Sequence, residues 1–190
     1  KDGRVSVFGK NVCAYDDEDL RHRIGYVQQK AVLFQGTVRS NLLWGDDSAS
    51  DDDLRTALNT AQVLDIVADK GGLDAPVEQN GANFSGGQKQ RLSVARALVR
   101  KPQILVLDDS SSALDYATEA AMRKAILALP YKPTLFIVSQ RASSVMCADR
   151  ILVLEDGRLV GDGNHKALLA NCPAYCEIYH SQFSEEVTDA

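Results

Sequence analysis

The second half of the chain alternates apolar runs with helical patterns. Near-continuous apolar runs occupy Ile104–Leu107, Leu135–Val138 and Ile151–Leu154, and helical patterns follow Gly86 and cover about 118–129. Parallel strands need crossover helices and are usually buried on both faces, so such runs are typical of them. The pattern predicts an α/β fold with a buried parallel sheet.

The first half contains shorter elements. Val5–Phe8 alternates like a half-buried strand that leads into a β-turn, and Ile24–Val27 is a second short strand. Ser50 caps a predicted helix that starts with Asp51 and whose apolar positions include Leu54, Leu58, Ala61 and Leu64. The glycine-rich stretch 71–81 is predicted to be a linker, and two further helices are expected around 166–170 and 174–183.

Charge and composition exclude several functions. The formal net charge of -5 and the pI near 5.2 argue against sequence-independent binding to nucleic acid or anionic lipid. No apolar run approaches the roughly 20 residues that span a bilayer, so we expect the chain itself to be soluble. Cys172 and Cys176 could form half of a metal site, but without two further ligands we expect free thiols in all four cysteines.

The stretch Asn83–Arg91, read NFSGGQKQR, opens a helix with a serine and two glycines. Free backbone N–H groups and the positive end of the helix dipole point outward at such a start. The sequence therefore predicts a seat for an anion such as a phosphate. Lys89, Arg91, Arg96 and Arg100 could be a nucleic-acid stripe, but we expect solvated helix residues.

Two carboxylates follow the apolar run 104–107. Asp108 and Asp109 stand at the carboxyl end of a predicted parallel strand, where open α/β sheets bind ligands. One carboxylate there can hold Mg²⁺ and the next can orient an attacking water. An aspartate that caps a turn would be the alternative if this pair stood alone.

The residues NFSGGQKQRLSVARALVRKPQILVLDDSSSALD resemble the signature motif, Walker B strand and D-loop of ATP-binding cassette (ABC) transporter ATPases. Tyr26–Gln29 and Leu33–Leu42 are similar to the Q-loop region of exporter-type cassettes. Ile137–Arg141 stands where that family has its switch-histidine loop, and Ala148–His165 resembles the usual end of the cassette.

The resemblance implies roles for individual residues. Asp108 and Gln29 would serve Mg²⁺ and Asp109 would be a weak general base, while Asp115 would bridge two sites as the D-loop. The switch position would be Gln140. The signature residues, which would contact an ATP held by a second subunit, are Phe84, Ser85, Gly86, Gly87 and Gln88. His165 would serve packing or capping.

Three departures from the family pattern matter. The phosphate loop, Walker A, is absent, because Gly9–Asn11 lacks the preceding glycine and the Mg-binding hydroxyl. Asp109 replaces a glutamate, and a misplacement on the order of 1 Å can cost ~10²-fold in rate. Gln140 replaces a histidine and cannot carry its charge or pass its proton. The pattern resembles the degenerate subunit of heterodimeric bacterial multidrug exporters.

The resemblance implies a P-loop NTPase-like, mostly parallel sheet with flanking helices and a helical signature subdomain. We expect one partial ATPase domain over 1–190, with the signature subdomain at about 38–100, the core sheet in 1–37 and 101–163, and terminal helices in 164–190. The first strands and the P-loop are interpreted as missing from a truncated cassette.

The implied function is ATP binding and hydrolysis with Mg²⁺, coupled to export at the cytoplasmic face of the plasma membrane. The implied partners are a second nucleotide-binding domain, in a heterodimer, and a transmembrane domain; no nucleic acid is expected. The fragment alone is expected to be inactive and to self-associate through uncovered sheet surface. The alternatives are a soluble cassette ATPase of the DNA-repair or chromosome type, which normally carries a coiled coil, and a non-enzymatic interaction fragment.

Overall fold

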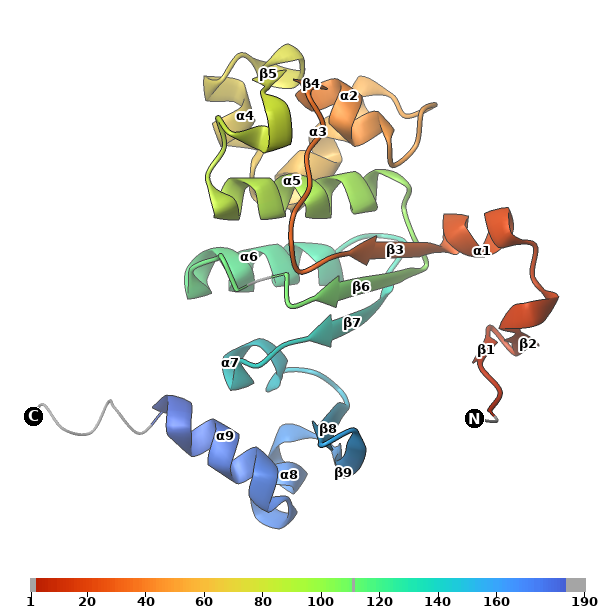
Figure 1. Ribbon diagram of the computed structural model, residues 1–190, viewed down its shortest axis with the longest axis vertical. Helices are drawn as coiled ribbons and strands as arrows, with labels where there is room; N and C mark the ends of the chain where they lie inside the picture. Colours follow the sequence, from red (N-terminus) through yellow and green to blue (C-terminus); the bar gives the residue numbers. More distant parts are fainter. Residues whose placement is uncertain (1–2, 111, 184–190) are drawn as a thin grey trace, which may run out of the picture. The chain divides into compact units, whose positions relative to one another are not determined.

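The computed structural model describes residues 3–110 and 112–183 in two compact units, 1–138 and 139–190 (Figure 1). The elements of the first unit, in chain order, are β1 (Ser6–Val7), β2 (Lys10–Asn11), η1 (Val12–Ala14), α1 (Asp17–Arg23), β3 (Ile24–Val27), β4 (Gly36–Thr37), α2 (Val38–Leu43), α3 (Asp51–Thr60), α4 (Leu64–Asp69), η2 (Gly72–Asp74), β5 (Pro76–Val77), η3 (Gln79–Gly81), α5 (Gly86–Val99), β6 (Ile104–Asp108), α6 (Tyr116–Leu127) and β7 (Thr134–Val138). Those of the second are α7 (Ala142–Val145), β8 (Ile151–Glu155), β9 (Arg158–Gly163), α8 (His165–Asn171) and α9 (Pro173–Phe183).

A parallel sheet in the order β3-β6-β7 forms the centre of the first unit. Its register places Tyr26, Val106 and Phe136 side by side on one face. The opposite face carries Val27 and Leu105, which are buried in the core. The predicted α/β class and the three strands of this sheet are confirmed.

The two faces of this sheet differ in exposure. Tyr26 is 53% exposed, and Phe136 and Val138 are each 54% exposed. The sequence predicted burial on both faces from the apolar runs alone. That prediction is wrong for this face, because the helices that contribute to the core pack against the other side, where Met122 and Ile126 of α6 lie with Leu105.

The third apolar run is not part of the parallel sheet. Among the described residues, β8 pairs antiparallel with β9 across a two-residue turn at Asp156–Gly157. Both turn residues have positive φ, 47° and 73°, which is the backbone that tight hairpins favour. The prediction of a parallel strand at 151–154 is therefore corrected, since local hairpin chemistry determines its partner.

Helix α5 is the central packing element of the first unit and contacts α2, α3 and β3 (Figure 1). Its buried residues include Leu92, Val94 and Leu98, which share one core with Leu54 and Leu58 of α3. Leu54 and Leu58 are fully buried, and each such side chain contributes roughly 1.5–3 kcal/mol of hydrophobic stabilisation. The helix that opens with the signature residues is thus held rigidly by the core.

Two local predictions are corrected. The stretch 71–81, predicted to be a linker, contains η2, β5 and η3, and its Leu73, Ala75 and Val77 are buried in the core. The helix predicted from Asp51 to Leu64 is two helices, because Gln62 has a positive φ of 58° between α3 and α4.

Other local predictions are confirmed. Residues Val5–Phe8 lead into a hairpin turn at Phe8–Gly9, so Gly9–Asn11 is a turn and strand rather than a phosphate loop. Ser50 caps α3 through a reciprocal bond with Asp53. In the second unit, His165 packs against Tyr175, with Nδ1 2.8 Å from the Tyr175 hydroxyl. All four cysteines are free thiols, and only Cys172 is buried.

Candidate functional site

The carboxyl ends of β3 and β6 bring four polar side chains together. The Tyr26 hydroxyl donates to Asp108 Oδ2 at 2.6 Å, and the Gln29 amide donates to Asp109 Oδ2 at 2.7 Å. Because β3 and β6 are parallel neighbours, residues that end one strand meet the residues that end the other. Gln29, Asp108 and Asp109 were predicted site residues, and the structure places them in one cluster.

Asp109 has an unusual backbone conformation. Its φ is 44°, in the left-handed region that few residues other than glycine, asparagine and aspartate adopt. Its amide donates to the carbonyl of Val138 on β7 at 2.8 Å, which fixes the chain at this turn. The position of the Asp109 carboxylate is therefore fixed by the backbone hydrogen bond to Val138 and by the side chain of Gln29.

The donor set fits a magnesium nucleotide better than a bare ion. No cluster of three or more histidine, cysteine or acidic side chains able to hold a metal occurs in 3–110 and 112–183. Mg²⁺ usually takes one or two carboxylates and completes its shell with waters and phosphates. Asp108 and Asp109 each keep one carboxylate oxygen that takes no hydrogen bond from the described residues.

The signature residues form a capped helix start. Ser85 accepts from the Gln88 amide at 3.3 Å, and the Gln88 side chain accepts from the Ser85 amide at 3.0 Å. The amides of Gly86 and Gly87 make no hydrogen bond to the described part of the chain. These two free N–H groups at the positive end of a 14-residue helix are suited to a phosphate oxygen.

Phe84 has a different environment from its neighbours. It is only 4% exposed and belongs to the core, with the Lys70 ammonium 4.9 Å from the ring centroid. A buried ring cannot contact a nucleotide directly. Phe84 therefore packs in the core below the helix start, while Ser85 and Gly86 are exposed and Gly87 is half-buried.

The predicted D-loop packs against the signature. A Cβ added to Gly87 would lie 2.9 Å from the carbonyl oxygen of Ala113 and 3.3 Å from the side chain of Leu114. Asp115 follows as the N-cap of α6 and accepts from the amide and hydroxyl of Thr118, at 2.9 and 2.8 Å. These two bonds hold the pKa of the Asp115 carboxyl below its usual value.

The arginines of α5 are not simply solvated, which corrects the sequence expectation. Arg91 donates to the carbonyls of Gln62 and Gly87, and Arg100 donates to those of Gly45 and Arg21. Their long side chains lie along the core because the helix is buried on most of its surface. Burial lowers the pKa of both Arg91 and Arg96.

Two residues of this region were not found from the sequence. Tyr26 was assigned to a strand and to the Q-loop region but to no role in the site, and its bond to Asp108 depends on strand register. Gln90 is 3% exposed and donates to the Gln28 carbonyl at 3.0 Å, which links α5 to the residue before Gln29. A polar residue on an otherwise buried helix face was the available signal for Gln90.

Gln140 belongs to the second unit, where its carbonyl accepts from Gln182 at 2.7 Å. Its predicted role at the switch position stays a prediction.

No helix in the described ranges has both the length and the apolar character needed to cross a bilayer.

A helix start with two free glycine amides and a pair of carboxylates at the end of a parallel strand are features typical of nucleotide-binding α/β proteins. The family model described as ABC transporter matches residues 1–112. The chain belongs to the ABC transporter family and corresponds to the nucleotide-binding domain of its exporters.

Relatives and a solved structure are similar over almost the entire chain. An uncharacterized ABC transporter ATP-binding protein, YfiB of Bacillus subtilis, is 45% identical over 189 residues, which cover 99% of this chain and 33% of the relative. An ATP-dependent lipid A-core flippase of Haemophilus ducreyi is 38% identical, with 97% of this chain and 32% of that protein covered. A bacterial Atm1-family ABC exporter with ATP bound is similar with a TM-score of 0.89 and 35% identity, over 95% of this chain and 32% of that one. The chain thus spans about a third of the length of these relatives.

The close approach of Gly87 to Ala113 predicts different effects for two adjacent glycines. Gly87→Ala should lower the free energy of unfolding by about 1–3 kcal/mol, because the added methyl group meets a backbone carbonyl. Gly86→Ala is the matched control, since its Cβ would lie 4.0 Å from the nearest atom. Urea unfolding followed by circular dichroism measures both; equal stability of the two variants would contradict the packing described here.

The bond between Tyr26 and Asp108 predicts a pH effect. Because its hydroxyl donates to the carboxylate, Tyr26 has a pKa above its usual value. The contribution of this hydrogen bond to the free energy of unfolding is therefore complete below pH ~10, the usual pKa of tyrosine. It is lost as the pH rises through the pKa of Tyr26 in the folded state. Ultraviolet titration measures the ionisation of the tyrosines, and subtracting the curve of Tyr26→Phe isolates the contribution of Tyr26. In the Asp108→Asn variant, Tyr26 should ionise at a lower pH than in the unaltered chain. Asp65→Asn, an exposed control, should leave the titration unchanged.

Proposed function

We propose that this chain is one nucleotide-binding domain of a heterodimeric ABC exporter and supplies Ser85–Gln88 to an ATP bound mainly by its partner. The observation that carries the proposal is the pair of free amides at Gly86 and Gly87, at the start of a helix fixed by the core. Two free N–H groups at the start of a 14-residue helix are suited to a phosphate oxygen of a bound nucleotide.

The site at Asp108 and Asp109 is proposed to be weakly catalytic. Asp108 would hold Mg²⁺ and Asp109 would orient the attacking water. Gln29 would reach toward the Mg²⁺ ion and couple the site to the transmembrane domain. Asp109 Oδ2 already accepts from Gln29, and its short side chain reaches less far than a glutamate. Gln140, proposed at the switch position, offers no imidazole. Asp115 is proposed to bridge the two sites.

The proposed assembly is a transporter at the cytoplasmic face of the plasma membrane. The names of the relatives, which include a lipid A-core flippase and a putative multidrug export protein, favour a transporter over a soluble ATPase of DNA repair. Within the proposed transporter, residues of about 38–100 would form the signature subdomain, and residues 1–37 and 101–163 would form the core sheet region. A membrane segment would dock at the exposed aromatic pair Phe34 and Trp44.

The proposal predicts how Mg-ATP binds. The 190 residues alone should bind it weakly and show no measurable hydrolysis, and they should self-associate through the exposed face of Tyr26 and Phe136. A version extended upstream to include a glycine-rich phosphate loop should bind Mg-ATP tightly but hydrolyse it slowly. Asp109→Glu in that version should raise the turnover number by up to ~10²-fold, since it restores the reach of the base.

Calorimetric titration measures the affinity for Mg-ATP, and phosphate release measures the turnover number. The control Asp65→Glu should change neither the affinity nor the turnover number. Tight binding of Mg-ATP by the 190 residues alone would contradict the proposed division of the site between two chains.

A further inference from the structure

Lys70 reaches from the end of α4 to the residues directly before the signature helix α5. Its ammonium donates to the carbonyl of Asn83 at 3.0 Å and lies 4.9 Å from the centroid of the Phe84 ring, which is a cation–π distance. A lysine at the end of a helix usually faces the last carbonyls of that helix. Lys70 is the residue that ends α4, yet it binds a carbonyl 13 residues further along the chain.

Asn83 is also held on its side-chain side. Its side-chain amide donates to the Pro76 carbonyl at 2.8 Å, and its side-chain oxygen accepts from the Glu78 amide at 3.1 Å. These two bonds fix the side chain of Asn83, and Lys70 adds a bond to its backbone. The peptide group that Lys70 binds is the one that leads into Phe84 and then into Ser85, the N-cap of α5.

Phe84 gives the ammonium a second partner in a fixed position. The ring is 4% exposed and belongs to the core, so packing determines where it lies. Lys70 itself is exposed, and its ammonium therefore remains hydrated on the side that faces solvent. One contact to a carbonyl and one to a ring face together hold the charge at this place.

The first turn of α5 benefits from such a restraint because it contains two glycines. Glycine has more backbone freedom than any other residue, and a Cβ on Gly86 would meet no atom closer than 4.0 Å. Packing therefore does little to fix the Gly86 amide. Its direction depends on the capping bonds of Ser85 and on the peptide groups that lead into the helix.

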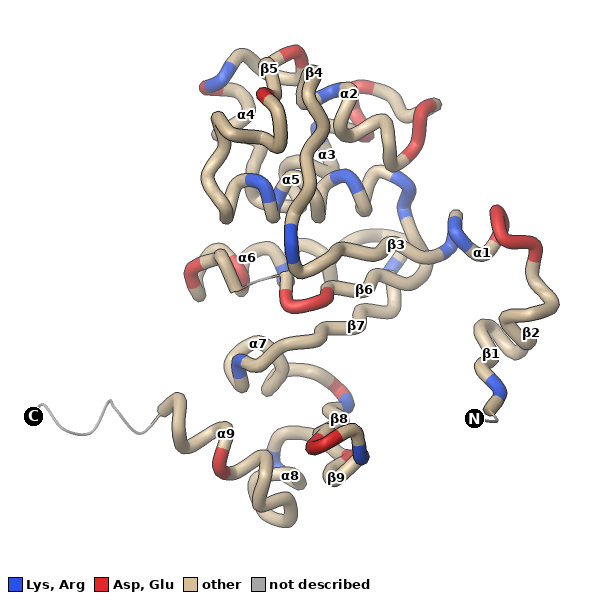
Figure 2. Tube along the Cα trace, viewed as in Figure 1, with Lys and Arg blue, Asp and Glu red and all other residues tan. Residues whose placement is uncertain are grey.

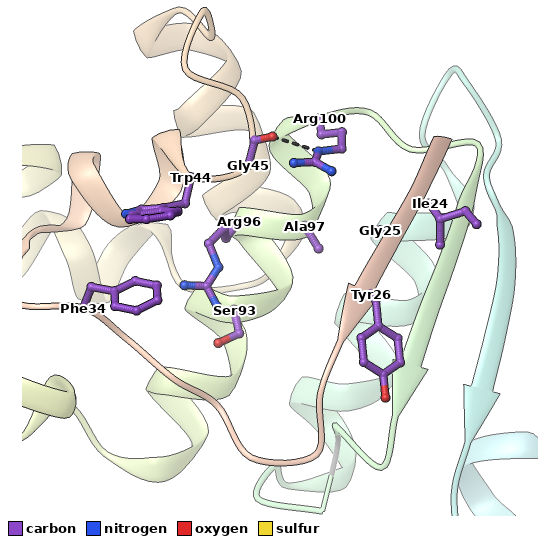
Figure 3. A pocket seen from close by; sticks show the side chains of 10 residues that line it. All are labelled: Ile24, Gly25, Tyr26, Phe34, Trp44, Gly45, Ser93, Arg96, Ala97 and Arg100. Carbon is purple, nitrogen blue, oxygen red and sulfur yellow. Dashed lines mark hydrogen bonds between the residues drawn. The ribbon is translucent and has the colours of Figure 1, made fainter. Parts of the chain in front are cut away.

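Basic residues recur along α5 (Figure 2), but three of them have other partners. Arg91 and Arg100 donate to backbone carbonyls. Arg96 lines an aromatic pocket of about 260 Å³ together with Phe34 and Trp44 (Figure 3). These contacts restrain the body of the helix rather than its entry.

We propose that Lys70 is a positioning residue of the phosphate seat. Its ammonium holds the peptide group between Asn83 and Phe84, so that the amides of Gly86 and Gly87 are presented in one direction. It also places a positive charge next to the two residues that precede the seat, which favours an anion there. The inference rests on the proposed function, because a helix start that binds no phosphate would need no positioning residue.

The test is the steady-state ATPase activity of the assembled transporter, measured as KM for Mg-ATP and as kcat. Lys70→Met removes both contacts and should raise KM about three- to tenfold, the effect expected from one hydrogen bond and one cation–π contact. The turnover number should change by a smaller factor. A role in stability alone would reduce the amount of folded protein and hence the apparent kcat, but it would leave KM unchanged.

Further variants identify the groups through which Lys70 acts. Phe84→Leu removes the ring but keeps an apolar anchor, so Lys70→Met should raise KM by a smaller factor in that background than in the unaltered chain. Lys70→Arg should keep KM near its original value, because a guanidinium can also donate to a carbonyl and lie over a ring. Lys166→Met removes an exposed lysine of the second unit and should leave KM unchanged.

Any of three results overturns the inference: an unchanged KM in Lys70→Met, an equal rise of KM in Lys166→Met, or an equal effect of Lys70→Met in the two Phe84 backgrounds. Ser85→Ala in the same assay tests the proposed function separately. If Ser85→Ala lowers the activity while Lys70→Met leaves KM unchanged, only the inference fails. If Ser85→Ala has no effect, the proposed function fails as well.

Discussion

The parallel pairing of β3 with β6 is the contact on which the candidate site depends. It places Tyr26 and Gln29 against the two carboxylates that end β6. Each of these side chains is at least partly exposed, so the site is built on a buried strand pair but open at its end. A shift of β3 by one residue would turn Tyr26 to the other face and break the contacts of Tyr26 and Gln29 with the two carboxylates.

Helix α5 connects this strand end to the proposed phosphate seat. Its first turn holds Ser85 and the two glycines, its second turn reaches the Gln28 carbonyl through Gln90, and Arg96 near its end lines the aromatic pocket. One helix thus carries the proposed phosphate seat at its start and, through Gln90, a contact to the residue before Gln29.

The three parallel strands of the first unit and the starts of α3 and α5 could be predicted because apolar runs and capping residues specify them locally, whereas α1 and α2 were not predicted. Ile24–Val27, Ile104–Leu107 and Leu135–Val138 were all located from apolar runs, and Ser50 and Asn83–Arg91 marked helix starts. The partner of β8 was missed because the two-residue turn at Asp156–Gly157 overrides the similarity of its apolar run to the other strands.

For the site, the resemblance to the ABC family implied that Gln29, Asp108 and Asp109 serve one centre. Spacing could not reveal Tyr26, whose role follows from register between strands about 80 residues apart. It also could not separate Arg91 and Arg100, which donate to carbonyls, from Arg96, whose Nη1 has no hydrogen-bond partner among the described residues, because only packing distinguishes them.

The central claim, that this chain completes a site on a partner while its own site is weak, is tested by the ATPase rate of the assembled transporter with one substitution at a time in this chain. We predict that Ser85→Ala removes most of the activity, because the seat contacts the competent nucleotide, whereas Asp109→Asn changes it little. Loss of activity with Asp109→Asn, together with retained activity in Ser85→Ala, would contradict the account.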